Sequence, residues 1–331
     1  MNWLCLELAV FDRNESDAMN LLASFRYLAA LDEHKHFGRA ALACHITQPA
    51  LSNALRALES EFGAVIVKRG RNFEGVTAEG RRVLASAQRM LHEREMLQQE
   101  LDSGLGKPQG VISIGAVPTA VPIAARFAAM LKIRYPGIEP SVRSMSSNEL
   151  EAGLKSLSLD VGFGYTERLR ANGPSLQQIP QYTEHYFFVR RAATPNDVLQ
   201  IGQPITWAEA GGQPLCLLTR EMHNRTIVDQ AFATAGVKNR PAIETNSILT
   251  LALAVVDGNV CSIMPGALVG ALRGYRELEA LPLVEPDMRT AIGFMAQGGD
   301  RPSRTLEACL ELARDPTWLG HCAIHSGLLR A

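Results

Sequence analysis

The chain has 331 residues, of which 47% are hydrophobic and 20% are charged, a composition that suits a soluble globular protein and excludes a disordered chain. At this length we expect two or more domains with sizeable cores. The formal net charge of −1 excludes a strongly basic nucleic-acid coat protein, so any contact with DNA must come from a local basic patch.

The N-terminal segment and the cysteines indicate where the protein works. Met1 to Phe11 is apolar but lacks a basic region, and acidic residues follow it, which argues against a signal peptide. Met19 offers an alternative start, so we expect residues 1–18 to be a variable extension. The longest apolar run, Leu249 to Val256 broken by Thr250, is too short to cross a bilayer. The cysteines are scattered without metal-ligand spacing, which predicts a cytoplasmic protein with reduced thiols.

Three helical patterns open the ordered part of the chain. The first, Asn20 to Glu33, carries leucines at helical spacing, and a short second helix follows from Gly38 to His45. Thr47 is a good N-cap for the third helix, and Pro49 lies in its first turn, where a missing N–H is tolerated. The apolar stripe of this third helix consists of Leu51, Leu55, Leu58 and Phe62. The second and third helices together predict a helix-turn-helix that reads DNA.

A wing and a long helix follow. Gly63 ends the third helix, and two short strands, Val65–Val67 and Phe73–Val76, flank a basic turn at residues 68–72. Thr77 caps a helix that we expect to run from Ala78 to about Leu105. Apolar residues at heptad spacing along it are Val83, Ala87, Met90, Leu97 and Leu101. Such a narrow seam on a charged helix predicts pairing with a partner helix.

Beyond a hinge at residues 104–108 the pattern changes to strands alternating with helices. Strands are expected at Val111–Val117, Glu139–Met145, Asp160–Gly164, Tyr186–Arg190, Pro214–Leu218, Val260–Met264 and Arg289–Ala296. Helices are expected at Pro122–Arg134, Asn148–Ser158, Asn224–Ala235, Ile248–Asp257 and Arg304–Arg314. This alternation predicts the α/β class, with open parallel sheets covered by helices on both faces.

Several motifs together resemble the LysR-type transcriptional regulators. In the N-terminal unit they are Phe37-Gly38-Arg39-Ala40-Ala41, Gln48-Pro49-Ala50-Leu51-Ser52, Leu58-Glu59, Gly63 and Thr77-Ala78-Glu79-Gly80. Farther along they are Val111-Ile112-Ser113-Ile114-Gly115, Tyr135-Pro136, Leu159-Asp160-Val161-Gly162, Asp257-Gly258 and Met264-Pro265. The resemblance covers residues 20 to about 312. Residues 1–18 and the tail from Trp318 are expected to lie outside it.

The resemblance implies a multidomain α/β protein that binds double-stranded operator DNA. Its parts would be a winged helix-turn-helix at 19–77, a linker and dimerisation helix at 78–106, and an effector-binding domain at 107–331. That domain would resemble a periplasmic binding protein, with lobe I at about 107–185 and 290–315 and lobe II at about 186–289. Two crossing strands, near Tyr186–Val189 and Arg289–Met295, would join the lobes. The family further implies a homodimer through the linker helix, a homotetramer built from two dimers, and a small-molecule effector between the lobes.

Polar side chains of the third helix and basic residues of the wing are the expected DNA contacts. The Gln48 amide can pair with adenine, whereas the Thr47 and Ser52 hydroxyls suit phosphate oxygens. The full set is Thr47, Gln48, Pro49, Ala50, Ser52, Asn53 and Arg56 on the helix, and Lys68, Arg69 and Arg71 on the wing. Each polar residue alone is equally well explained as solvated helix surface, but the set favours an operator-reading face.

Hydroxyls, amides and glycines follow the expected strands, at the sheet edge where open α/β folds bind ligands. These candidate effector contacts are Thr119, Ser146, Ser147, Gly164, Tyr165, Thr219, Arg220, Asn246 and Ser247. Any one of them alone is better explained as a simple helix cap. As a set around one cleft they predict a small polar or anionic effector.

Two other classes of function fit the sequence less well than a regulator. An enzyme would need a catalytic or phosphate-binding motif, and Gly-x-Ser-x-Gly, P-loop and HExxH patterns are absent. A pure solute-binding protein would not explain Gln48–Gly63. Some members of the family sense oxidants through a cysteine, but the corresponding stretch, Leu218–Asn224, contains none, and Cys216 and Cys261 fall in apolar strand patterns. We therefore expect a non-enzymatic regulator without cofactor or metal, and the sequence does not identify its effector or operator.

Overall fold

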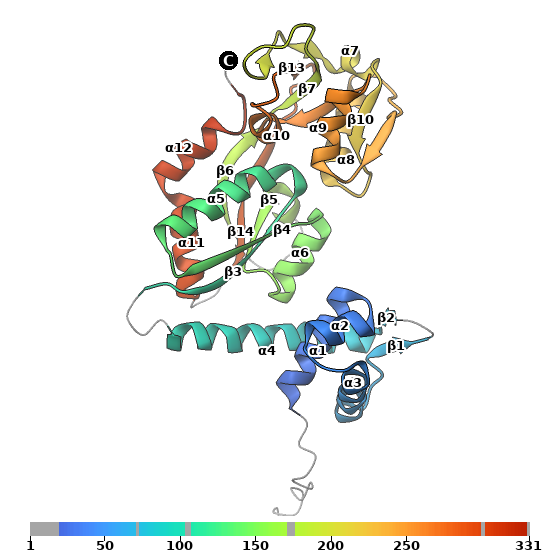
Figure 1. Cartoon of the computed structure of the whole chain (residues 1–331), viewed down its shortest axis with the longest axis vertical. Coiled ribbons are helices and arrows are strands. Elements are labelled where there is room, and N and C mark those ends of the chain that lie inside the picture. Colours follow the sequence, from blue (N-terminus) through green and yellow to red (C-terminus); the bar gives the residue numbers. More distant parts are fainter. Residues whose placement is uncertain (1–19, 71–72, 103–106, 171–175, 299–301, 330–331) are drawn as a thin grey trace, which may run out of the picture. The chain divides into compact units, whose positions relative to one another are not determined.

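The computed structural model describes residues 20–70, 73–102, 107–170, 176–298 and 302–329 (Figure 1). The expected extension, residues 1–18, lies outside them. Two compact units, Met1–Glu95 and Met96–Ala331, make up the chain. Among the described residues, no helix is both long enough and apolar enough to span a membrane.

The N-terminal unit is a helix-turn-helix with a two-stranded wing. Its elements are α1 (Leu21–His34), α2 (Phe37–Ala43), α3 (Gln48–Phe62), β1 (Val67–Arg69), β2 (Phe73–Val76) and the start of α4 (Ala78–Asp102). Side-chain caps begin the helices where the sequence predicts, since Asn20 accepts from the Ala23 N–H and Thr47 from the Ala50 N–H. Phe25, Leu28, Leu51, Leu55 and Leu58 are at most 1% exposed and form the centre of the core.

The predicted first strand of the wing was wrong by two residues. β1 begins at Val67 rather than Val65 and pairs with β2 in antiparallel fashion. The cause is Glu59, whose Oε1 accepts the Ile66 and Val67 N–H groups at 3.0 Å each and holds the chain away from the strand until that point. Lys68 and Arg69 therefore belong to the strand and not to the turn.

The predicted heptad seam of the long helix is divided between two environments. Ala87 is completely buried and Val83 packs beside it, both in the core of the helix-turn-helix unit. Met90, Leu97 and Leu101 are 48%, 56% and 68% exposed and remain uncovered in the single chain. The first part of the seam thus serves the chain's own domain, which the spacing alone did not reveal. α4 is described to Asp102, and the predicted end near Leu105 lies outside the described residues.

The C-terminal unit contains two mixed sheets, each with its own helices. The first sheet, which we call lobe I, has the order β4-β3-β5-β14-β6, with β3 (Gly110–Ala116), β4 (Ile138–Ser144), β5 (Val161–Tyr165), β6 (Leu176–Glu184) and β14 (Thr290–Gln297). Its helices are η1 (Pro118–Ala120), α5 (Val121–Arg134), α6 (Ser147–Ser156), η2 (Thr166–Arg170), α11 (Arg304–Arg314) and α12 (Pro316–Ile324).

The second sheet, lobe II, has the order β11-β10-β12-β7-β13-β8, with β9 also paired to β13. Its strands are β7 (Tyr186–Arg191), β8 (Gln200–Ile201), β9 (Ile205–Thr206), β10 (Leu215–Leu218), β11 (Ile243–Thr245), β12 (Cys261–Pro265) and β13 (Leu278–Val284). Its helices are α7 (Trp207–Gly211), α8 (His223–Thr234), α9 (Ile248–Asp257) and α10 (Gly266–Ala271). The expectation of purely parallel sheets was wrong, because β14 runs antiparallel to β5 and β6, and β7 antiparallel to β12 and β13.

The chain passes between the lobes twice inside this fold (Figure 1). Only His185 separates β6 from β7, and residues 285–289 connect β13 to β14. The predicted crossing strands, Tyr186–Val189 and Arg289–Met295, begin at these two crossings and lead into the next lobe. β6, which leads to the first crossing, was missed, since its glutamine-rich sequence lacks the apolar pattern of a buried strand.

Candidate DNA interface and effector cleft

The two faces of α3 differ sharply in burial. Leu51, Leu55 and Leu58 face the core, while Gln48 and Asn53 belong to an exposed face. Of the expected DNA contacts, Thr47, Pro49, Ala50, Arg56 and Lys68 are also exposed, and Ser52 is half-buried. The side chain of Arg69 and all of Arg71 lie outside the described residues. Apart from half-buried Ser52, the described members of this set are thus solvent-exposed, and Arg56 donates to Asn53 Oδ1 at 3.1 Å.

Two hydrogen bonds hold the wing against α3, and Thr77 ties the start of α4 to the segment before β1. Glu59 of α3 accepts from the backbone of β1, as described above. Thr77 Oγ1 donates to the Val65 carbonyl at 2.6 Å and accepts from the Gly80 N–H at 2.9 Å, so it also caps α4. A Cβ on Gly80 would lie 2.2 Å from the Ile66 carbonyl oxygen, which requires glycine there. The charged wing is therefore fixed in its position relative to α3.

A hollow of about 200 Å³ lies between the lobes. Lobe I lines it with Val117, Pro118, Thr119, Ser146, Ser147 and Tyr165, and lobe II with Leu218, Met222, His223 and Asn224. A neighbouring hollow of about 180 Å³ shares Val117, Ser147 and Tyr165 and adds Leu150, Glu151, Arg168 and Met295. Both volumes include open solvent, so the hollows are shallow depressions and not preformed sites for a drug-sized molecule.

The structure brings four of the predicted effector contacts together in this cleft and leaves five outside both hollows. Those inside are Thr119, Ser146, Ser147 and Tyr165. Those outside are Gly164, Thr219, Arg220, Asn246 and Ser247. Thr219 donates to Glu221 Oε1 at 2.6 Å, and Ser247 caps α9. These hydroxyls therefore make local hydrogen bonds within their own loops.

The first turn of α8 supplies the lobe II side of the cleft, which sequence reasoning missed. Arg225 anchors this turn, because its buried guanidinium donates to the Leu218 carbonyl at 2.8 Å and to Glu244 Oε1 at 2.6 Å. The N-cap of α8, Met222, offers no side-chain acceptor to the helix. The available sequence signal was the polar pair His223-Asn224 at a helix start after a strand end.

Polar atoms without partners face this region from both lobes. Ser147 is 7% exposed and Asn224 is 5% exposed, and within the described residues neither Ser147 Oγ nor Asn224 Nδ2 has a hydrogen-bond partner within 3.5 Å. The Asn224 side chain does lie close enough to the Tyr165 and Tyr186 hydroxyls to lower their pKa values slightly against the larger effect of burial. Thr119 Oγ1 and Tyr165 Oη lie 3.1 Å apart, and burial raises the pKa of Tyr165, so its hydroxyl stays protonated. The cleft therefore combines neutral hydroxyl and amide groups that a polar ligand can satisfy.

Two side-chain contacts of His223 join the lobes across the cleft. Arg168 of η2 lies 3.1 Å from His223 Nδ1, measured from Nη1, and the rings of Tyr165 and His223 meet edge-on with centroids 4.7 Å apart. Burial, and then the charge of Arg168, lowers the pKa of His223. Neither Arg168 nor His223 was among the predicted site residues.

The thiols of the described residues are poorly suited to reaction. Cys216, Cys309 and Cys322 are buried, and Cys44 and Cys261 are half-buried. Burial raises the pKa of all five, that of Cys322 to about 11. A thiol in this state is protonated at neutral pH and a weak nucleophile. Over the same residues, no group of His, Cys, Asp and Glu side chains is arranged to hold a metal ion.

Two family models match this chain. Residues 22–81 match "Bacterial regulatory helix-turn-helix protein, lysR family", and residues 105–317 match "LysR substrate binding domain". The DNA-binding transcriptional dual regulator OxyR of Escherichia coli K12 is 26% identical over 297 residues, which are 88% of this chain and 94% of the relative. The probable regulator LrrA of Synechococcus elongatus is 29% identical over 74% of this chain and 80% of its own.

Solved structures share the fold over most of the chain. A full-length OxyR variant from Pseudomonas aeruginosa superposes with a TM-score of 0.64 at 21% identity, covering 88% of this chain and 97% of that one. CbnR, a LysR family transcriptional regulator, superposes with a TM-score of 0.62 at 19% identity, covering 88% of this chain and 98% of its own. At these identities the likeness concerns architecture, and residue roles must come from this chain's own geometry.

Proposed function

Since this chain belongs to the LysR family of DNA-binding transcriptional regulators, with a helix-turn-helix domain and an effector-binding domain, we propose that a small polar or anionic molecule in the interlobe cleft controls its binding to operator DNA. Its relatives are regulators, not enzymes. We assign residues 19–77 to DNA binding, 78–106 to the linker, and 107–331 to the effector-binding domain. As a DNA-binding regulator of this family, it would act in the cytoplasm.

The exposed face of α3 is the proposed reader of the operator. Gln48 lies in its first turn, where side chains of a recognition helix meet base edges. Asn53 and Arg56 follow on the same helix, and Lys68 adds positive charge on the wing. Arg69 and Arg71 are proposed as further wing contacts on their sequence alone. This surface supplies the local basic patch that a chain of net charge −1 needs for binding DNA.

The observation that carries the effector proposal is the pair of unpartnered buried groups, Ser147 Oγ and Asn224 Nδ2. They come from different lobes and line the same hollow. An unsatisfied buried polar group costs about 1–3 kcal/mol, which a ligand that bonds to both would recover. Such a ligand would also favour one arrangement of the lobes, and this is the differential affinity that a switch requires.

Peroxide sensing is the main alternative for the input. Several relatives carry the description "Hydrogen peroxide-inducible genes activator", including one from Haemophilus influenzae that is 26% identical over 84% of this chain. The cleft of this chain is lined by His223 and Asn224, and no described cysteine is among its lining residues. With the pKa values of the described thiols raised, the structure favours reversible ligand binding over thiol oxidation.

We also propose that the exposed residues Met90, Leu97 and Leu101 of α4 form a homodimer with the same helix of a second copy. Their spacing of seven and four residues is that of a coiled-coil seam. A homotetramer of two such dimers is the assembly we propose from family membership.

Ligand binding in the cleft can be tested by thermal unfolding of the full chain with formate, acetate, oxalate and succinate. We expect at least one carboxylate to raise the unfolding temperature, and Ser147→Ala and Asn224→Ala to reduce that shift. Ser141→Ala is the matched control, because Ser141 is exposed on β4 outside both hollows. Equal shifts in all three variants would place the ligand elsewhere.

A further inference from the structure

The hydrogen-bond chemistry of Arg168 determines which nitrogen of His223 carries the proton. Arg168 Nη1 and His223 Nδ1 are 3.1 Å apart. A guanidinium has only N–H donors and stays charged at any physiological pH, so it cannot accept a hydrogen bond. His223 Nδ1 must therefore be the acceptor and carries no hydrogen. In the neutral imidazole the proton then resides on Nε2.

Arg168 is itself held in place from lobe I. Its Nε donates to Glu151 Oε1 at 2.9 Å, and its Nη2 donates to Asn148 Oδ1 at 2.8 Å, both on α6. The side chain is 30% exposed, and Glu151 balances its charge. Arg168 thus presents a fixed donor to His223 rather than a free cation to the cleft.

We infer that Arg168 is a positioning residue that holds His223 as the Nε2–H tautomer, so that the cleft offers a neutral N–H donor to a carboxylate or similar oxyanion of the effector. This inference rests on the effector function proposed above and deepens it by naming the ligand group and the residue that selects it. We assign Arg168 to act through His223, because each of its three nitrogens already makes one hydrogen bond and the contacts to Glu151 and Asn148 hold the guanidinium against α6.

The remaining polar groups of the cleft fit the same ligand chemistry. Asn224 Nδ2 is a second donor, and it lies buried without a partner. The hydroxyl of Ser147, also unpartnered, can donate as well. The uncapped first turn of α8 begins at His223, and helix N-termini favour negative charge. Donors predominate, so an oxygen acceptor of small size is the complementary ligand.

A fall in pH should break the hydrogen bond between Arg168 and His223. The charged groups that act on His223 are Arg168 and Glu167 of η2 and Glu151 of α6, and the neutral ring of Tyr165 covers one edge. Protonation of Nδ1 would replace the hydrogen bond by two facing cations. The contact between the lobes would then be lost as the imidazole becomes charged.

The first experiment follows deuterium exchange at the histidine C2 position by mass spectrometry across a pH series, which gives the pKa of His223 in the full chain without any ligand. We expect Arg168→Met to raise that pKa, because the neighbouring cation is removed while burial, the larger cause of the lowered value, stays. In Arg168→Lys, which keeps the positive charge, the pKa of His223 should be closer to its wild-type value. Arg190→Met, which removes an exposed arginine of β7 paired with Glu279, is the control and should leave the midpoint unchanged.

An unchanged His223 midpoint in Arg168→Met would overturn the inference. A wild-type His223 that is already charged at pH 7.5 would overturn it equally, and this result needs no variant to fold. Because neither measurement involves a ligand, both outcomes are independent of whether the effector proposal holds.

The second experiment distinguishes the two ring nitrogens. A glutamine amide can reproduce the donor at Nε2, whereas an asparagine amide reaches only the position of Nδ1. With acetate and succinate as probes, we expect His223→Gln to keep most of the thermal shift and His223→Asn to require about tenfold more ligand for the same shift. The reverse order would overturn the donor assignment. No response of the wild type to any carboxylate would contradict the anionic-effector function, while the exchange experiment would still decide the role of Arg168.

Discussion

Among the described residues, Glu184 is the one fully buried carboxyl group, and it lies where β6 leaves lobe I. Burial raises its pKa to about 8 from an ordinary value of 4.5. Tyr182 donates a long hydrogen bond of 3.4 Å to Oε1, and Oε2 has no partner. The carboxyl is therefore neutral at pH 7 in the folded chain. As the pH rises from 4.5 to 8, the unfolded chain ionises while the folded chain does not, so folding loses stability across that window.

Glu184→Gln should remove this loss. At pH 5 we expect the variant and the wild type to unfold at similar urea concentrations. At pH 8 the variant should be more stable by a few kcal/mol, because each unit of pKa difference between the folded and unfolded chain contributes about 1.4 kcal/mol. Glu139→Gln, at an exposed position of β4, serves as the matched control. A Glu184→Gln variant whose advantage does not grow with pH would contradict the raised pKa.

The exposed polar residues of α3 and the wing should separate into readers of bases and binders of phosphate. Gln48→Ala is expected to lower the preference for operator over random DNA by about 1–3 kcal/mol, because a bidentate contact to a base edge is lost. Lys68→Ala should weaken both complexes alike and reduce the salt dependence by about one charge. Footprinting and salt titration would measure both effects, and unchanged selectivity in Gln48→Ala would exclude a base-reading role.

At the scale of elements, the exposed half of the α4 seam is where a second copy should bind. Leu97→Lys places a charge in the proposed interface, and we expect the dimer to dissociate at micromolar concentration in light-scattering measurements. Val198→Lys, which changes another residue more than half exposed, should leave the oligomer intact. If Leu97→Lys keeps the wild-type mass, then α4 is not the dimer contact.

Local signals predicted helices well where caps mark both ends. α9 and α11 begin after Ser247 and Ser303, whose side chains accept from the first turn, and both matched the sequence limits. β6 escaped prediction because polar glutamines interrupt its apolar residues. α12 escaped as well, although Asp315 and Pro316 form a recognisable helix start.

In the site, too, local sequence patterns predicted some residues, whereas contacts between distant parts of the chain were missed. Thr119, Ser146 and Ser147 could be placed because they lie within three residues of the ends of β3 and β4, and Tyr165 because it is the last residue of β5. The contact between Arg168 and His223 joins residues that are 55 positions apart, and no local pattern in the sequence marks such a pair. Tertiary packing also decided the burial of Ala87, whose spacing alone suggested a partner chain.

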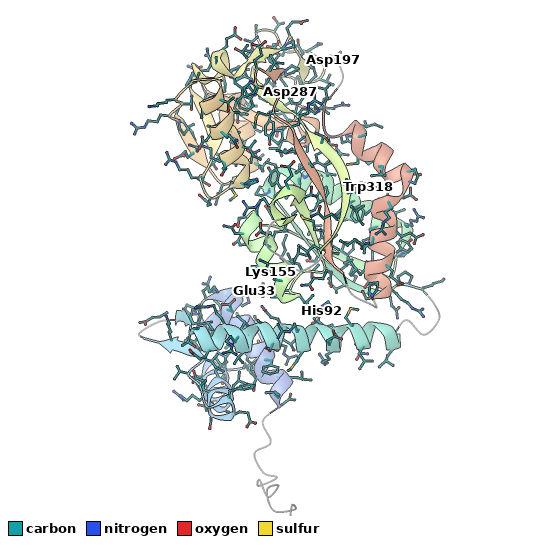
Figure 2. All side chains as sticks on the ribbon, turned by 180° about the vertical axis from the view of Figure 1, so that it is seen from behind. Glu33, His92, Lys155, Asp197, Asp287 and Trp318 are labelled. Carbon is teal, nitrogen blue, oxygen red and sulfur yellow. The ribbon has the colours of Figure 1, made fainter. Side chains whose placement is uncertain are left out.

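Across the whole effector unit, the C-terminal segment is a third connection between the lobes. Trp318 of α12 is completely buried, packs edge-on against Phe127 of α5 and lies beside the lobe I sheet (Figure 2). A few residues later, Leu329 is 5% exposed in the core of lobe II. The family match ends at residue 317, so this connection follows the region that the family model describes.

Leu329→Ala should therefore destabilise the effector unit by about 2–5 kcal/mol, as expected for a large-to-small change in a core. Leu328→Ala is the matched control, because its neighbouring side chain is 55% exposed. Thermal unfolding of the full chain would compare the two variants. Equal unfolding temperatures would mean that the tail does not contribute to the core of lobe II.

Coupling between the cleft and the operator is the central claim for the whole molecule. The most direct measurement is the affinity and footprint of the full-length protein on the DNA upstream of its own gene, with and without formate, acetate, oxalate or succinate. We predict that at least one carboxylate changes the affinity or the footprint of the wild type and leaves those of Asn224→Ala unchanged. Identical affinities and footprints of the wild type under every condition would contradict the account.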